Sequence, residues 1–245
     1  MKDVLVDILA HTIPLNILDT IKVTGSNTET LFESLAADTS IVFKANLKTP
    51  LPELNGIFGM SNLKILKGLT DFASFKTDNA TVSIRNEIKD NVDTPVEIIF
   101  KDEDNRTAHY RLLPPSIVPN QPKPINSAWD ITFIPTKSKI QELNKAAQIF
   151  SGQEEFFFVK TVGDELQIFI GEEGSSSHRM YVTFNKGSTG TVSGLHWNIS
   201  QVIDVLKLIT DSDITEMKIM NKGLLQISIE NDVATYQFLL PAKKK

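Results

Sequence analysis

A proline-rich segment near the middle of the chain is the feature that most constrains its fold. Five of the twelve residues from 113 to 124 are proline. Proline fixes φ and lacks an amide donor, so this stretch can form neither a helix nor a central strand. We interpret it as a stiff, extended linker. It divides the chain into an N-terminal domain (1–113), a connector (114–127) and a C-terminal domain (128–245).

Short segments with strand periodicity dominate both halves. Apolar residues alternate with polar ones, and Gly, Asn and Asp stand in the turns between the segments. In the first half the predicted strands are 31–35, 41–45, 80–84, 97–101 and 106–112. In the second half they are 156–159, 166–170, 179–184, 215–220, 224–229 and 235–240.

Four segments have helical periodicity instead, namely 2–12, 52–63, 138–150 and 199–209. Gly152 suits the end of the third, and Asn198 with Gln201 three residues later forms a capping pattern at the start of the fourth. The order of a helix followed by strands therefore occurs twice in each half. This order predicts an α+β fold of two similar domains, with antiparallel sheets and helices on one face.

Composition excludes several classes of site and location. The 245 residues include no cysteine, so there is no disulfide, thiolate metal site or cysteine nucleophile. Asp3 and Asp7 interrupt the N-terminal apolar stretch, which excludes a secretory signal. Because no apolar run approaches about 20 residues, we expect no transmembrane segment.

The motifs of catalysis and metal binding also fail their spacing tests. The acidic run at Asp102 lacks the glycine and glutamate of an EF-hand loop, and we assign it to a solvated turn. The glycines at Gly187 and Gly190 follow a lysine instead of preceding one, so they form no phosphate loop. We therefore predict no catalytic residue, no metal and no cofactor. An enzyme with a dispersed acid–base pair stays open, because such a pair leaves no local spacing.

Charge is distributed unevenly along the chain. The net charge is −5, which argues against a simple nucleic-acid binder. The acids, however, gather in turns, while lysines gather on or beside the predicted helices. If the helices share a face, that face can contact phosphate without sequence specificity. For any single lysine, an ordinary solvated helix face is the commoner explanation.

Several segments, in order, resemble the sliding clamps of T-even phages. Residues 54–59 (LNGIFG) are similar to the second helix of that family, 31–47 to a strand–turn–strand, and 119–124 to the interdomain connector. Residues 140–170 and 234–241 resemble a helix with its hairpin and the terminal strand. The family shares its fold with proliferating cell nuclear antigen.

The resemblance implies a non-enzymatic processivity factor that forms a homotrimeric ring around duplex DNA. Helices would line the hole, a clamp loader would open the ring, and the replicative DNA polymerase would bind through a short peptide. The location implied is the cytoplasm of an infected bacterial host. The acidic first helix and the tail 243–245 depart from the family pattern. A structural or adaptor protein with two β-rich domains is the alternative.

The resemblance also assigns candidate residues. Those of the DNA channel are Lys137, Lys139, Lys145 and Lys207, with Lys64, Lys67 and Lys2. Those of a partner-peptide pocket are Ile117, Val118, Leu240 and Pro241, which could equally pack the domain junction. Those of the subunit interface, where 106–112 would pair with 179–185 of the next subunit, are Arg106, His109, Tyr110, Arg111, Arg179, Tyr181 and Thr183.

Overall fold

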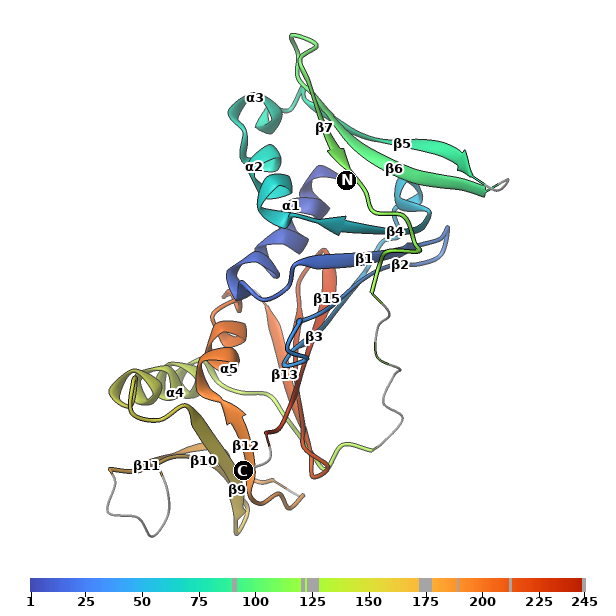
Figure 1. Ribbon diagram of the computed structural model, residues 1–245. Helices are drawn as coiled ribbons and strands as arrows, with labels where there is room; N and C mark the ends of the chain where they lie inside the picture. The colour runs from blue at the N-terminus through green and yellow to red at the C-terminus, as the bar shows by residue number, and fades with distance from the viewer. Residues whose placement is uncertain are drawn as a thin grey trace. The chain divides into compact units, whose positions relative to one another are not determined.

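The chain folds into two compact units in a computed structural model (Figure 1). The structure describes residues 1–89, 92–119, 122, 128–171, 178–188, 190–211 and 213–243. Unit 1 comprises Met1–Pro122 with Asn231–Tyr236, and unit 2 comprises Lys123–Glu230 with Gln237–Lys245. Half of the predicted connector (120, 121 and 123–127), the glutamates at 172 and 173, Thr189 and the tail residues Lys244 and Lys245 lie outside the described residues.

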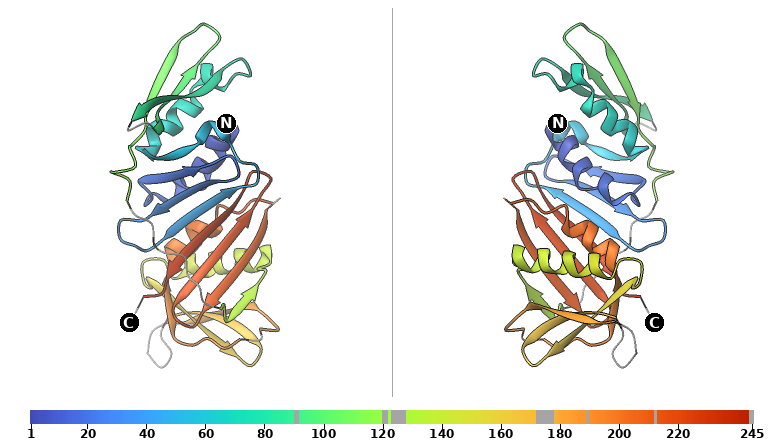
Figure 2. Two further views of the ribbon diagram at one scale, coloured as in Figure 1. Left: turned by 90° about the vertical axis from the view of Figure 1, so that its right-hand side faces the viewer. Right: turned by 90° about the vertical axis from the view of Figure 1, so that its left-hand side faces the viewer.

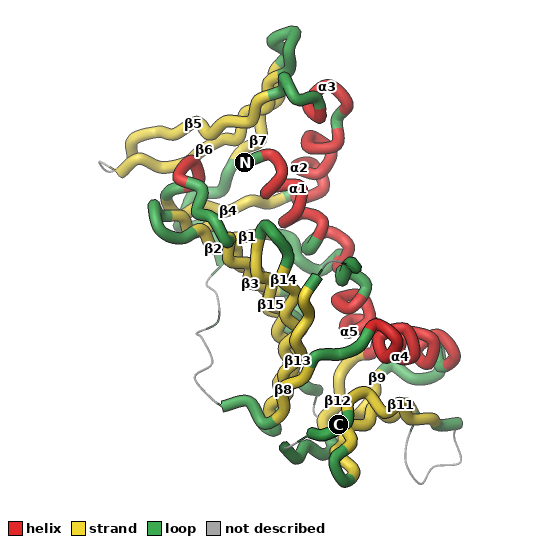
Figure 3. Tube along the Cα trace, turned by 180° about the vertical axis from the view of Figure 1, so that it is seen from behind, coloured by secondary structure: helices red, strands yellow, loops and turns green. Residues whose placement is uncertain are grey.

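Unit 1 combines three α-helices with two groups of strands. Strands β4, β1, β2 and β3 are neighbours in this order, and β5, β6 and β7 form a separate sheet. Figure 3 shows α1, α2 and α3 together on one side of β1 and β4. The elements are α1 (Lys2–Ala10), η1 (Ile13–Leu15), β1 (Thr20–Gly25), β2 (Thr30–Leu35), β3 (Val42–Leu47), η2 (Pro52–Leu54), β4 (Gly56–Ser61), α2 (Leu63–Asp71), α3 (Ala73–Lys76), β5 (Thr81–Lys89), β6 (Val92–Lys101) and β7 (Thr107–Arg111).

The core of unit 1 forms where the apolar helix faces meet the sheets. Leu5, Ile8 and Leu9 recur at helical spacing in α1 and are fully buried. From α3, Phe75 packs against Phe100 of β6, with ring centroids 5.8 Å apart. The core therefore joins both sheets of this unit to the same helix layer.

Unit 2 repeats the arrangement with two longer helices. Strands β11, β10, β9 and β12 form one sheet, and β15, β14, β13 and β8 are neighbours in a second. Figures 1 and 2 show α4 and α5 beside each other on one side of β13. The elements are β8 (Ile131–Phe133), α4 (Lys137–Ile149), β9 (Phe156–Val162), β10 (Glu165–Ile170), β11 (Met180–Asn185), β12 (Leu195–Asn198), α5 (Ile199–Leu206), β13 (Ile214–Met220), β14 (Leu224–Glu230) and β15 (Ala234–Pro241), whose first residues belong to unit 1.

Both predicted helices of unit 2 are confirmed, and their caps explain where they begin. The side chain of Thr136 accepts from the amide of Lys139 at the start of α4 (3.3 Å). Asn198 accepts from the amide of Gln201 at the start of α5 (3.2 Å), as its spacing predicts. Each cap satisfies an amide that has no partner within its helix.

The predicted helix at 52–63 is wrong. The structure has a single 3₁₀ turn, η2, followed by strand β4, and helix α2 begins only at Leu63. Gly56 has φ of +112°, which is incompatible with a helix. In β4, Phe58 and Met60 are buried against β1 while Ile57 is exposed. Side chains therefore alternate between the two faces every second residue, as in a strand. The likeness of 54–59 to a clamp helix is therefore misleading.

The rest of the strand pattern is confirmed, with omissions. Every other predicted segment coincides with a strand or helix of the structure. Strands β1, β4, β8 and β12, helix α2 and the short helix α3 were not predicted. β8 and β12 have 3 and 4 residues, too few for alternation to stand out.

Two glycine substitutions should change stability in opposite directions. A Cβ on Gly25 would lie 1.9 Å from the carbonyl oxygen of Leu54, whereas nothing lies within 4 Å of one on Gly68 in α2. We expect Gly25→Ala to lower the free energy of unfolding by about 1–3 kcal/mol. Gly68→Ala should raise it by about 0.5–1 kcal/mol, because alanine loses less backbone entropy in a helix.

Urea denaturation of both variants tests this pair. An unchanged or raised midpoint for Gly25→Ala would contradict the close approach of η2 to β1.

Candidate functional site

The lysines predicted to contact DNA lie on two groups of helices. Lys137, Lys139 and Lys145 are in α4 and Lys207 follows α5, in unit 2. In unit 1, Lys2 begins α1 and Lys64 and Lys67 lie in α2. Within each unit the fold thus brings these lysines onto one helix layer, as the charge pattern predicts.

Acidic side chains neutralise most of the lysines in unit 2. Lys137 pairs with Asp211 at 2.6 Å and Lys139 with Glu142 at 2.7 Å. The hydrogen bond from Lys137 holds the pKa of Asp211 below its usual range. Lys145 is exposed and makes no ion pair within the described part of the chain. It is therefore the α4 lysine most available to an anion.

In unit 1 the lysines divide by role. Lys2 donates to the carbonyl oxygens of Phe75, Lys76 and Thr77 at 3.4, 3.1 and 3.0 Å, so it holds the end of α3. This role is structural, and the three hydrogen bonds make the Lys2 ammonium group less available to phosphate than that of Lys64. Lys67 pairs with Asp71, whose pKa it lowers together with Lys76. Among the described residues, exposed Lys64 forms no ion pair.

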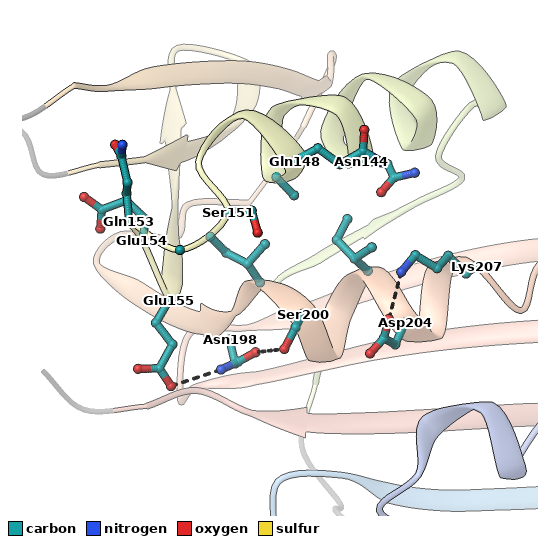
Figure 4. A pocket seen from close by; sticks show the side chains of 14 residues that line it. Asn144, Gln148, Ser151, Gln153, Glu154, Glu155, Asn198, Ser200, Asp204 and Lys207 are labelled. Carbon is teal, nitrogen blue, oxygen red and sulfur yellow. Dashed lines mark hydrogen bonds and ion pairs between the residues drawn. The ribbon is translucent and has the colours of Figure 1, made fainter.

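A polar cleft of about 660 Å³ separates α4 from α5 (Figure 4). Lys207 lies at one end and pairs with Asp204 at 3.0 Å. At the other end, Glu155 accepts a hydrogen bond from Asn198 at 3.2 Å. Acidic residues outnumber basic ones along the cleft, with Glu154, Glu155 and Asp204 against Lys207, so it is not a favourable site for phosphate.

The predicted peptide-pocket residues differ in exposure. Ile117 is 64% exposed and Pro241 is also exposed, so both side chains are available to a partner. Val118 packs over Gly59. A Cβ placed on Gly59 would lie 2.7 Å from a methyl carbon of Val118. Leu240 is 1% exposed, and its carbonyl accepts from the Trp197 indole at 2.9 Å. Its side chain fills the core of unit 2, which corrects its assignment to a docking surface.

The strands predicted to meet at the subunit interface are both sheet edges. Within the described residues, β7 pairs along its length with β6 alone and β11 with β10 alone. Such edges present unpaired backbone groups, which are ready to bond another chain.

The side chains on these edges alternate as the strand pattern predicts. Arg106, His109, Arg111, Arg179 and Tyr181 are exposed. Thr183 is half-buried and donates to Glu165 at 3.1 Å.

Tyr110 is the exception. It is 4% exposed, and its hydroxyl donates to the carbonyl of Ser61. Burial raises the pKa of Tyr110. Its side chain therefore belongs to the core of unit 1, and its prediction as an interface side chain is wrong.

Glu97 on β6 organises a cluster of basic residues on this sheet. Its side chain is 6% exposed and contacts Arg85 at 2.9 Å, His109 at 3.1 Å and Arg111 at 3.3 Å. The hydrogen bond from Arg85, followed by that from His109, holds the pKa of Glu97 below its usual range. No spacing motif predicts this cluster, because β-sheet register assembles it from three strands.

The described residues contain no group of three or more His, Asp or Glu side chains that could hold a metal ion. The acidic run at Asp102 forms the predicted turn, but Asp102 itself is buried, not solvated. Its carboxylate accepts from the amides of Asp104 (3.0 Å) and Arg106 (2.9 Å). Of the helices described, none is long and apolar enough to span a bilayer.

Comparison with solved structures identifies the fold. PCNA from Thermococcus kodakaraensis matches with a TM-score of 0.68 and 14% identity, over 99% of this chain and 97% of that chain. A. fulgidus PCNA, in a structure with the C-terminal region of FEN-1 bound, matches with a TM-score of 0.71 and 8% identity, over 100% and 97%. At the level of sequence, no family model and no curated protein matches. The chain therefore has the α+β DNA clamp fold of PCNA.

The Glu97 cluster predicts a defined pH dependence of stability. A carboxylate with a lowered pKa in the folded state stabilises the fold above its ordinary value of 4.5, and this contribution is lost as the pH falls through the lower, folded-state pKa. We expect Glu97→Gln to lower the free energy of unfolding by about 1–3 kcal/mol at pH 7. The difference from wild type should shrink below about pH 4.

Urea titrations at pH 7 and below about pH 4 test this, with Glu87→Gln as the matched control. Glu87 pairs with Arg85 at 2.7 Å but is 42% exposed, so its loss should cost less than about 1 kcal/mol. Equal effects of the two substitutions would show that Glu97 does not organise the sheet.

Proposed function

We propose that this chain is the subunit of a sliding clamp of the T-even-phage type. Three copies would close into a ring around duplex DNA and tether the replicative DNA polymerase for processive synthesis. The observation that carries the proposal is the likeness to PCNA across essentially the whole chain, including both units. We infer a tethering function without chemistry of its own, in the cytoplasm of an infected bacterial host.

Two open edges on one chain support a closed ring. Unit 1 offers β7 and unit 2 offers β11, and these surfaces differ from each other. A contact between two different surfaces is head-to-tail, and it produces a ring when the rotation closes. We propose that Arg106, His109 and Arg111 of one copy meet Arg179, Tyr181 and Thr183 of the next.

The charge balance of the helix layer suits a protein that slides. A ring retains DNA by enclosing it, so strong binding by each subunit is unnecessary. Ion pairs offset Lys137, Lys139 and Lys207, which leaves few free cations to hold phosphate. We propose that Lys145 and Lys64 make the most frequent phosphate contacts, and that these contacts carry no sequence information.

Partners would act on the outside of such a ring. A clamp loader would open it, and a short peptide of the polymerase would bind near the exposed side chains of Ile117 and Pro241. One PCNA neighbour carries the C-terminal region of FEN-1, which supports recognition of a terminal peptide.

The assembly is tested first by mass. Light scattering across a concentration series should show association toward three times 27.3 kDa. A monomer at every concentration would rule out a self-assembled ring and favour an adaptor protein with two β-rich domains.

The helix face is tested by two substitutions with opposite expected effects. Lys145→Ala should weaken binding to a short duplex and reduce the slope of log K against log salt by about one. Asp204→Asn frees Lys207 from its 3.0 Å ion pair and should strengthen binding at low salt.

Fluorescence anisotropy of a labelled duplex measures both effects. Lys222→Ala, in the exposed turn after β13, removes the same charge away from the helices and should leave binding unchanged. Equal losses in Lys145→Ala and Lys222→Ala would contradict a role for α4.

A further inference from the structure

Within the bounds of β7 and β11, the exposed side chains fall on odd-numbered residues. On β7, Thr107, His109 and Arg111 are exposed while Tyr110 is buried. On β11, Tyr181 is 57% exposed, and Val182 beneath it is buried. When two strands pair, opposite residues have their side chains on the same face of the sheet. Odd residues of β7 must therefore meet odd residues of β11.

The backbone of β7 imposes the same condition. The amide of Leu112 donates to the carbonyl of Val96 at 3.0 Å, and the amide of Asp102 donates to the carbonyl of Arg106 at 3.1 Å. Even-numbered residues of β7 therefore bond to β6. Because backbone groups alternate in direction along a strand, the odd residues direct theirs to the open edge.

The backbone direction in β11 follows from the opposite side of its sheet. The amide of Ile199 donates to the carbonyl of Glu155 at 2.9 Å, so odd residues of β9 bond to β12. Alternation across the observed registers then makes even residues of β9 bond to β10. Between Met180 and Thr183, before the register shift that places Asn185 opposite Leu166, even residues of β11 bond to β10. The open edge of β11 is formed by its odd residues, Tyr181 and Thr183.

Charge eliminates two of the odd-to-odd antiparallel registers. Placing His109 opposite Tyr181 also places Arg111 opposite Arg179. Placing Thr107 opposite Tyr181 places His109 opposite Arg179. Basic side chains that face each other directly across a strand pair are destabilising.

A register shifted by two residues in the other direction is excluded by backbone hydrogen bonds instead of by charge. It would put Arg111 opposite Thr183 and Leu113 opposite Tyr181. Leu113 already exchanges both backbone hydrogen bonds with Gly59 of β4, at 2.8 and 2.9 Å. It therefore has no backbone groups left for a second chain.

We propose that β7 of one copy pairs antiparallel with β11 of the next in the one of these four registers that remains, with Arg111 opposite Tyr181 and His109 opposite Thr183. This inference rests on the proposed ring and specifies its joint. The Arg111 guanidinium stacks on the Tyr181 ring as a cation–π contact.

This register joins two rows of side chains that are already aligned. In the β5–β6–β7 sheet, Arg85, Glu97 and Arg111 lie directly opposite one another, and Glu97 holds Arg111 at 3.3 Å. The contact thus begins with an arginine oriented by a buried carboxylate.

The second row is aromatic. Tyr181, Phe169, Phe158 and His196 lie opposite one another across β11, β10, β9 and β12. Successive ring centroids are 5.5, 4.8 and 5.8 Å apart. Tyr181 is the exposed end of this row, where a cation from another copy would complete it.

Disulfide trapping tests the register, because the chain has no cysteine of its own. The variant His109→Cys/Thr183→Cys places thiols opposite each other, with Cα atoms about 5.5 Å apart, within disulfide range. The control Thr107→Cys/Thr183→Cys is displaced by two residues, about 7–8 Å apart, and should not bond. We expect covalent ladders of two and three chains, after mild oxidation, from the first variant only.

Each other outcome overturns the register in a distinguishable way. Ladders from the control alone would mean a shifted pairing. Ladders from neither variant, with association in light scattering, would mean that the copies meet elsewhere, and the ring proposal would survive. Strictly monomeric protein would overturn both proposals.

A double-mutant cycle tests the cation–π contact itself. Arg111→Ala, Tyr181→Ala and their combination should show a coupling of about two- to fivefold in the association constant. Tyr181→Phe keeps the aromatic face and should associate nearly as wild type. Additive losses would show that Arg111 and Tyr181 do not touch.

Discussion

The burial of apolar helix faces against antiparallel sheets is the constraint on which the rest of each unit depends. In unit 1, Leu5, Ile8 and Leu9 of α1 are fully buried. In unit 2, Leu143 of α4 and Val202 of α5 have the same role, at 1% exposure. Because one face of every helix is thus committed to the core, its polar residues face outward together. Any surface that contacts DNA is a consequence of this packing.

The same packing explains why the helix layers are less basic than their lysine content suggests. Acids lie close to the lysines: packing brings Asp211, beyond the end of α5, to Lys137 of α4, and Asp204 lies three residues before Lys207. Exposed pairs of this kind add little stability, but they reduce the charge available to phosphate. For the proposed ring, weak attraction to phosphate would permit movement along DNA, whereas a strongly basic face would hold the protein in place.

The edge strands combine exposed side chains with a fixed orientation of those side chains. Among the described residues, β7 and β11 each keep one open backbone edge, yet their exposed side chains are held in place by neighbours in their own sheets. Glu97 orients Arg111 from one side, and Phe169 supports Tyr181 from the other. An edge with pre-oriented side chains and unpaired backbone groups favours one register over its alternatives, because a register shift changes every opposing pair.

The sequence by itself determined most strands, three of the four predicted helices, and caps such as Asn198 with Gln201. These features depend on periodicity and hydrogen bonds within a few residues. Only the tertiary structure decided that 52–63 is a turn and a strand, because β1 pairs with that segment. Long-range packing also decided that Tyr110 and Leu240 face inward and that Lys2 holds the end of α3. The ion pair of Lys137 with Asp211 joins residues far apart in the chain, and local spacing contains no information about such contacts.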